Sequence, residues 1–286
     1  MGDNDETMTS GIKEALDAGA LLAGPMLPID SGDGRVPFVA VPDGYDVKSI
    51  EHFLPFPTRK YADVSVTTTD SFIDYAKKHG SLDECVIYAE IDAEQSKCIL
   101  RALMNDNSAD APKWRDHKCT FEPALSVEWK RWLSKNGPGK SMSQTDFATW
   151  LEDNQGDVRS VDGSPSGADI LAMAQAFEIN ADKRVKSHIN LQSGGVRFEF
   201  VEDETKDTRT SMEVFRRFTL GLPVFDGSSD AYPVEARLKY RDNSGKVTFW
   251  YELIRPDRAF KTAVQSSLDQ IKEATGFMLL YGTPGL

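Results

Sequence analysis

The clearest pattern in the chain lies near its C-terminus, in Val234-Glu235-Ala236-Arg237-Leu238-Lys239-Tyr240-Arg241, Asp242-Asn243-Ser244-Gly245 and Val247-Thr248-Phe249-Trp250-Tyr251-Glu252-Leu253. Apolar and charged residues alternate in the first segment, which places the two kinds on opposite faces of a strand. The middle segment is typical of a turn, and the third again has apolar residues at every other position. The pattern therefore predicts a β-hairpin with one buried face and one charged face.

The rest of the chain groups strands and helices into blocks. Strands are predicted over residues 85–92, 97–104 and 117–122, although the middle run also fits a helix. One helix with a periodic apolar face is predicted to begin at Thr69 or Asp70, and others are predicted to follow the capping residues Ser126, Ser143, Ser166 and Asp257. Such grouping is typical of an α+β fold. We predict mainly antiparallel sheets with short helices and a C-terminal hairpin–helix–strand unit, in which residues 277–281 form the closing strand.

Polar stretches rich in glycine, serine and proline indicate where the chain divides. Residues 1–23 are predicted to be an N-terminal segment with a short helix across Ile12, Ala15 and Leu16. The stretch 156–167 is predicted to separate an N-terminal α+β subdomain, residues 24–160, from a β-rich α+β subdomain, residues 161–286. A length of 286 residues fits one large domain or two modest ones.

Composition excludes several classes of protein. Hydrophobic residues make up 40% of the chain, which is enough for a sizeable core and excludes wholesale disorder. No apolar run is long enough to span a membrane, and the acidic N-terminus is unlike a secretion signal. The 3 cysteines cannot all pair within the chain, which suits a reducing cytoplasm. The net charge of −12 does not favour general binding of nucleic acid.

Three residues are candidates for catalysis. Glu90 and Asp92 flank Ile91 near a strand end, where carboxylates can hold a divalent cation in nucleases and phosphatases. A solvated strand terminus explains the same pair more simply. His117 shares a strand face with Cys119, but the chain has no C-x-x-C or H-x-x-x-H spacing for zinc. We therefore predict no metal and no cofactor.

Two further motifs concern anions. Gly137-Pro138-Gly139-Lys140-Ser141 resembles the end of a phosphate-binding loop. The motif needs an earlier glycine where Ser134 stands, and it follows a helix instead of a strand, so a helix–helix connector is favoured. Arg237, Lys239 and Arg241 form a basic row that could meet phosphate, but a charge ladder with carboxylates of a neighbouring hairpin is the simpler account.

Several segments together resemble the YfdQ-like family of phage and prophage proteins, a domain of unknown function. The resemblance covers nearly the whole chain after the first ten residues, and the segments that carry it include Val41-Pro42-Asp43-Gly44-Tyr45, Glu51-His52-Phe53-Leu54-Pro55, Asp70-Ser71-Phe72-Ile73-Asp74-Tyr75, Arg217-Phe218-Thr219-Leu220-Gly221-Leu222-Pro223-Val224-Phe225, Val234-Glu235-Ala236-Arg237-Leu238-Lys239-Tyr240-Arg241 and Glu273-Ala274-Thr275-Gly276. It implies an accessory protein of a tailed phage or prophage in the cytoplasm of a bacterial host. It supplies no catalytic residues.

The sequence thus leaves three hypotheses about function. The first is a non-enzymatic phage accessory protein that acts by binding a host or phage protein or by assembling into a homo-oligomer. The second is a metal-dependent hydrolase or nuclease that uses Glu90 and Asp92. The third is a nucleic-acid accessory protein that uses the row Arg237, Lys239 and Arg241. The absence of a convincing catalytic set favours the first.

Overall fold

The computed structural model of the chain describes residues 19, 27–29, 38–40, 51–57, 59–109, 111–161, 163–180, 184–190, 195–201, 209–243 and 246–285. It divides into two compact units, residues 1–60 and residues 61–286. In the first unit, β1 (Leu27–Ile29) pairs antiparallel with β2 (Phe38–Ala40), and η1 (Glu51–Phe53) is a single 3-10 turn. The short helix predicted across Ile12, Ala15 and Leu16 lies outside the described residues.

A five-stranded sheet lies in the second unit, in the order β14-β4-β5-β6-β3. Its three central strands, β4 (Val86–Asp92), β5 (Lys97–Leu103) and β6 (His117–Phe121), are antiparallel neighbours, as predicted. The run that also fitted a helix is therefore a strand. The two outer strands, β3 (Ala62–Val66) and β14 (Met278–Tyr281), are parallel to their neighbours, which makes the sheet mixed.

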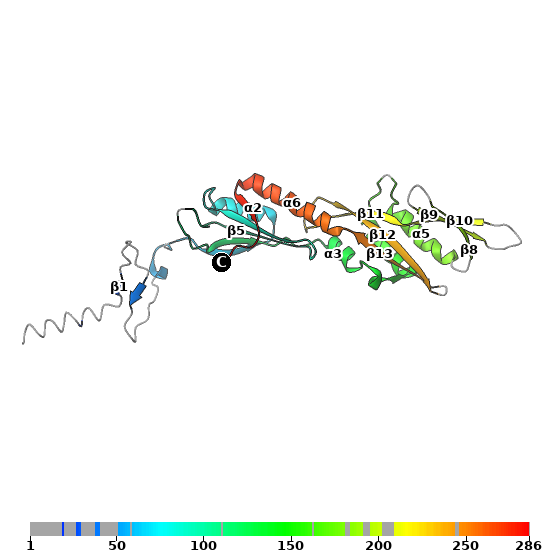
Figure 1. Cartoon of the computed structure of the whole chain (residues 1–286), viewed down its shortest axis with the longest axis horizontal. Coiled ribbons are helices and arrows are strands. Elements are labelled where there is room, and N and C mark those ends of the chain that lie inside the picture. Colours follow the sequence, from blue (N-terminus) through cyan, green and yellow to red (C-terminus); the bar gives the residue numbers. More distant parts are fainter. Residues whose placement is uncertain are drawn as a thin grey trace, which may run out of the picture. The chain divides into compact units, whose positions relative to one another are not determined.

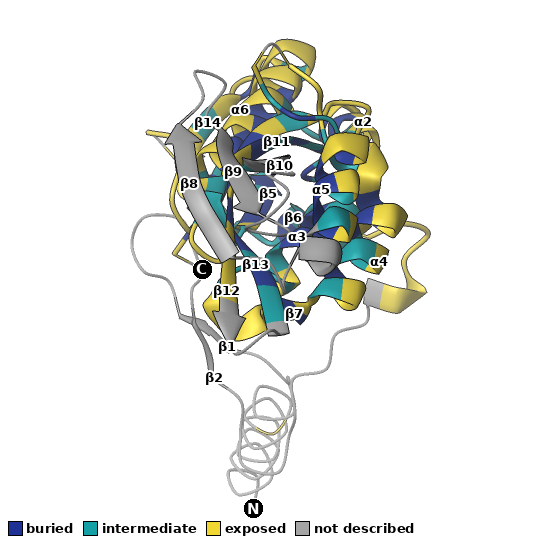
Figure 2. Ribbon diagram, turned by 90° about the vertical axis from the view of Figure 1, so that its right-hand side faces the viewer, coloured by how far each residue is buried: buried dark blue, intermediate teal, exposed yellow. Residues whose placement is uncertain are grey.

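Two helices, α2 (Thr69–His79) and α6 (Pro256–Thr275), pack together on one face of this sheet (Figure 1). The hydroxyl of Thr68 caps α2 by accepting a hydrogen bond from the amide of Ser71. Asp257 does not cap α6 as predicted, because the N-cap position is Arg255 and Asp257 pairs with it from the first turn. The outward faces of both helices are exposed, as Figure 2 shows, while their apolar faces are buried in the core.

The predicted C-terminal hairpin forms the centre of a four-stranded sheet. Its strands, β12 (Tyr232–Asn243) and β13 (Lys246–Ile254), are flanked by β11 (Arg217–Leu222) and by the two-residue strand β7 (Met142–Ser143). Leu238 lies opposite Tyr251 and Tyr240 lies opposite Phe249. Leu238, Phe249 and Tyr251 are buried as predicted, whereas Tyr240 is 37% exposed.

Three further helices contribute buried residues to the core, and serine hydroxyls cap each of them as predicted. They are α3 (Val127–Ser134), α4 (Gln144–Asn154) and α5 (Gly167–Asn180), with caps at Ser126, Ser143 and Ser166. The short turns η2 (Pro138–Lys140) and η3 (Gln155–Asp157) follow the first two helices. Trp132 of α3 is fully buried against Tyr251 of β13, whose hydroxyl donates a hydrogen bond of 2.8 Å to the Trp132 carbonyl.

In a third sheet, β9 (Gly195–Val201) pairs antiparallel with β8 (Arg184–Asn190) on one side and with β10 (Arg209–Phe215) on the other. Five α-helices and mostly antiparallel pairings among the described residues make the fold α+β, as predicted. None of the described helices is long and apolar enough to span a membrane. The subdivision into residues 24–160 and 161–286 stays a prediction.

Candidate functional site

Glu90, the first predicted catalytic residue, is half-exposed and already engaged on two sides. Its carboxylate accepts a hydrogen bond of 2.8 Å from Arg101 on the neighbouring strand and one of 3.2 Å from the hydroxyl of Thr283. The hydrogen bond from Arg101 is the main cause that lowers the pKa of Glu90 below its usual value. Glu90 therefore ties the C-terminal tail to β4.

Asp92, two residues further on, closes the turn between β4 and β5. One oxygen of its carboxylate accepts 3.0 Å hydrogen bonds from the backbone amides of Glu94 and Gln95. An aspartate that bonds amides two and three residues ahead is a common turn-forming arrangement. The structure thus gives Asp92 a local role that needs no metal, and any catalytic role stays a prediction.

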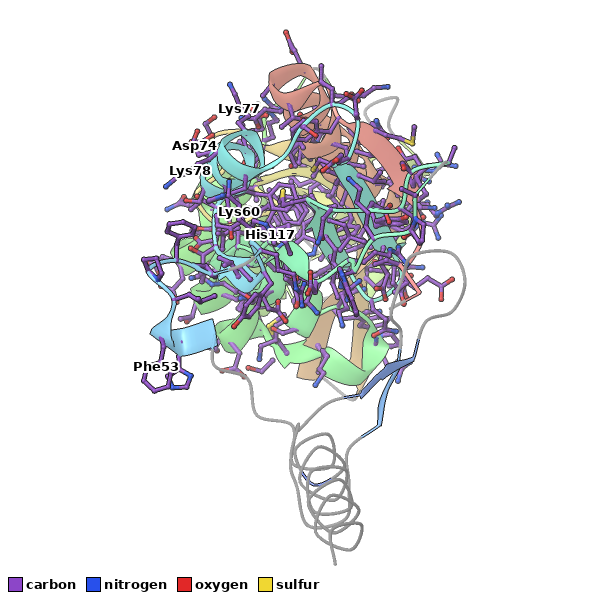
Figure 3. All side chains as sticks on the ribbon, turned by 90° about the vertical axis from the view of Figure 1, so that its left-hand side faces the viewer. Phe53, Lys60, Asp74, Lys77, Lys78 and His117 are labelled. Atoms are coloured by element: carbon purple, nitrogen blue, oxygen red, sulfur yellow. The ribbon has the colours of Figure 1, made fainter. Side chains whose placement is uncertain are left out.

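His117 lies on the opposite face of the sheet from Glu90. It is 5% exposed, its ring Nε2 is 3.1 Å from the hydroxyl of Tyr75 on α2, and its ring centroid is 5.3 Å from that of His79. Asp74 and Lys77 of α2 are exposed, and Figure 3 shows them with His117 below them in that view. The structure therefore does not bring His117 together with the two predicted carboxylates.

The three cysteines are buried and free. Burial raises the pKa of Cys85 and of Cys98 to about 12 and that of Cys119 to about 11. The Sγ atom of Cys85 is 3.7 Å from the sulfur of Met104, so its neighbour is another apolar group. Across the part of the chain that the structure describes, no cluster of three or more His, Cys, Asp or Glu side chains could hold a metal ion.

These thiols should be unreactive in the folded protein. At pH 8 a pKa of about 11 or 12 leaves almost no thiolate, and burial excludes reagent. We expect iodoacetamide to label none of the 3 cysteines in the native chain and all of them in denaturant, as counted by intact mass. Rapid labelling of the native chain would show that the cysteine-bearing strands open readily.

A buried ion pair was not predicted from the sequence. Asp106, 6% exposed, accepts a 2.7 Å hydrogen bond from Nε of Arg115 and a 2.9 Å hydrogen bond from the hydroxyl of Tyr88. Burial, followed by the hydrogen bond to Asp106, raises the pKa of Tyr88. Arg115 also donates a hydrogen bond to the carbonyl of Gly285. The C-terminal tail is therefore held at two points, at Thr283 by Glu90 and at Gly285 by Arg115.

The edge strand β14, which this tail follows, presents an apolar edge. Met278 is 60% exposed, Leu280 40% and Tyr281 64%. No other described strand pairs with the outer side of β14. Proteins usually protect such edges with charges, proline or a bulge, and Met278-Leu279-Leu280-Tyr281 contains neither a charge nor a proline. We call these four residues and their free backbone side the β14 edge.

One cleft in the described part of the second unit has a volume of about 700 Å³. Its walls are the start of α2, one side of α6 and the loop before β12, and they carry hydroxyl groups and the carboxylates of Asp70, Asp226 and Asp230. No lysine or arginine is among the residues that line it. Such a lining suits a hydroxyl-rich or cationic ligand better than an anion.

The glycine-rich segment Gly137–Ser141 connects α3 to β7. The amide of Gly137 donates a 2.8 Å hydrogen bond to the carbonyl of Tyr251, and Lys140 is exposed. Gly137 has a φ of 97°, a conformation that favours glycine. The glycine at this position therefore serves the turn that joins the helix to the sheet.

The comparisons with known proteins give a family and no activity. No curated protein and no solved structure matches the chain. The model of one family, described as an uncharacterized conserved protein (DUF2303), matches residues 12–284. With nearly the whole length matched, the chain belongs to the DUF2303 family.

Proposed function

We propose that this chain is a phage or prophage accessory protein of the bacterial host cytoplasm that acts by assembling into a homo-oligomer and binding other proteins, without catalysis of its own. The phage context rests on the sequence resemblance to YfdQ-like proteins. The β14 edge is the observation that carries the proposal for assembly. Open apolar strand edges pair readily with another strand.

The geometry favours pairing of two copies through their β14 edges. A two-fold axis brings the same surface of each copy together, so the two β14 strands would run antiparallel. Exposed Met278 and Leu280 would then be removed from water on one face of the joined sheet and Tyr281 on the other. Four residues bury less than a standard interface of roughly 800 Å² per partner, so we expect weak association, on the order of micromolar.

The measurement is light scattering of the full chain across micromolar concentrations. We expect the mass to rise with concentration from 31.8 kDa towards twice that value. Met278→Lys combined with Leu280→Lys should keep the mass at 31.8 kDa, because charges on the edge block strand pairing. The matched control is Val161→Lys, which changes an apolar residue 44% exposed elsewhere in the unit and should associate as the parent does.

Two results would contradict the proposal. A mass of 31.8 kDa at every concentration would exclude assembly, and an oligomer unaffected by the double substitution would exclude the β14 edge. Circular dichroism of the double variant, with Met278→Lys alone as a milder second variant, separates lost assembly from lost folding. The alternative of a metal-dependent hydrolase centred on Glu90 and Asp92 predicts saturable heat on titration with Mg²⁺ or Mn²⁺, whereas the assembly proposal predicts none.

A further inference from the structure

The charged face of the four-stranded sheet gathers more cations than the predicted row. On β12, Arg237, Lys239 and Arg241 are exposed on the side opposite buried Ala236 and Leu238. Pairing with β11 adds a fourth cation, because exposed Arg217 lies directly opposite Arg237. Like charges directly opposite each other on a sheet repel. A bound anion would relieve whatever part of this repulsion the neighbouring carboxylates of Glu235 and Glu252 do not offset.

A fifth cation reaches this face from outside the sheet. Arg159 follows η3, and its amide donates a 2.8 Å hydrogen bond to the carbonyl of Thr219 on β11. The Arg159 side chain lies over the position that a side chain at Gly221 would take, because a Cβ atom there would be 3.5 Å from Cδ of Arg159. Gly221 shares its strand face with Arg217, so the arginine side chain lies on the charged face.

Acidic groups only partly balance these cations. Glu235 pairs with Arg217 at 2.7 Å, and Glu252 lies opposite Arg237 in the strand register. Five cations less two carboxylates leave an excess of three positive charges on one face of a chain whose net charge is −12. Among the described residues, Lys239 has no carboxylate within ion-pair distance. A polyanion would therefore be attracted here and repelled from much of the remaining surface.

An aromatic ring lies among the cations. Trp250 of β13 is half-exposed and lies opposite Lys239 in the strand register. The guanidinium of Arg241 is 5.7 Å from the centre of the Trp250 ring. The Nε1 atom of Trp250 donates a hydrogen bond of 3.3 Å to the carboxylate of Glu252. Aromatic rings within a basic groove stack on the bases of single-stranded nucleic acid, whereas bases in a duplex are already stacked on one another.

We propose that the face formed by Arg159, Arg217, Arg237, Lys239, Arg241 and Trp250 binds single-stranded nucleic acid. The cations contact successive phosphates along β12, and Trp250 stacks on one base. This activity is separate from assembly through the β14 edge. The negative net charge disfavours binding of a polyanion to the rest of the surface. The phosphate contacts release counterions from the nucleic acid, which makes the affinity sensitive to salt.

The test measures fluorescence anisotropy of a labelled oligothymidylate titrated with the full chain at several salt concentrations. We expect saturable binding at low salt that weakens as salt rises. Lys239→Gln with Arg241→Gln should weaken binding at least about ten-fold and reduce the slope of log affinity against log salt by about 1.4, as for two lost phosphate contacts on a single strand. Trp250→Leu should weaken binding about ten-fold and leave that slope unchanged.

The matched control is Lys77→Gln with Lys78→Gln, which removes two exposed charges from α2. The control should bind as the parent does, and circular dichroism should show every variant folded. Absence of binding at low salt would overturn the proposal, as would equal weakening by both double variants. Tighter binding of a duplex of the same length, or of an acidic peptide, would show that the face serves a different polyanion and would also overturn it.

Discussion

Phe249→Ala should lower the free energy of unfolding by about 3–5 kcal/mol, the range for removing a large buried aromatic side chain. Phe249 is fully buried in β13. Its ring is stacked on that of Phe147 from α4, with centroids 5.0 Å apart and planes 10° apart. Removing it would leave a cavity where the hairpin packs against a helix, and the surrounding side chains can fill such a cavity only partly.

Two substitutions serve as matched controls, one at the neighbouring residue and one smaller change at Phe249 itself. Thr248→Ala alters the half-exposed residue on the opposite face and should cost little, since surface changes usually stay within about 0.5 kcal/mol. Phe249→Leu keeps much of the apolar volume and should cost less than Phe249→Ala. Urea unfolding measures the free energy of unfolding of all three variants. Equal stability of Phe249→Ala and Thr248→Ala would contradict the packing described for Phe249.

The strands and helices that the sequence predicted correctly all carry a strong local signal. The period of two in residues 234–241 identifies both β12 and its buried face. Serine caps locate the starts of α3, α4 and α5 because the hydroxyl satisfies an amide within three residues. Gly276, with a φ of 70°, ends α6 where glycine tolerates a left-handed conformation.

Pairings between distant segments could not be predicted in the same way. Nothing in Ala62–Val66 indicates that this strand lies parallel to β6, and Met278–Tyr281 gives no sign of its partner β4. Strand β7 is two residues long, too short for any period to appear. Such pairings depend on the arrangement of the whole chain, which local periodicity does not contain.

The positions of Glu90 and Asp92 along their strand could be predicted from the sequence, but their contacts could not. Glu90 and Asp92 do lie near a strand end, yet the residue that bonds Glu90 besides Arg101 is Thr283, which is 193 positions away. Asp106 lies in a polar stretch that resembles a solvated loop, and no pattern signals that it is buried with Arg115. Charged residues are rarely buried unless paired, and the pairing is visible only in three dimensions.

Arg115→Ala should therefore be nearly as damaging as Phe249→Ala. Asp106 is 6% exposed and bonds Arg115 at 2.7 Å, so removal of the guanidinium leaves a buried carboxylate without its counter-charge. Breaking a buried pair from one side costs about 3–5 kcal/mol. The same substitution also frees the carbonyl of Gly285 and removes the cation 5.9 Å from the ring of Tyr88.

An exposed ion pair with the same N–O distance supplies a control that separates the effect of burial from that of the ion pair itself. Arg217 bonds Glu235 at the same 2.7 Å, but its side chain is 58% exposed, against 18% for Arg115. Arg217→Ala should cost at most about 1 kcal/mol, because water solvates both partners once they separate. Asp106→Ala with Arg115→Ala should cost less than the sum of the single substitutions, since the double variant leaves no unpaired buried charge. If urea unfolding showed equal losses of stability for Arg115→Ala and Arg217→Ala, water would have to reach Asp106. In that case Glu90 and the pairing of β14 would hold the C-terminal tail, and the ion pair would not.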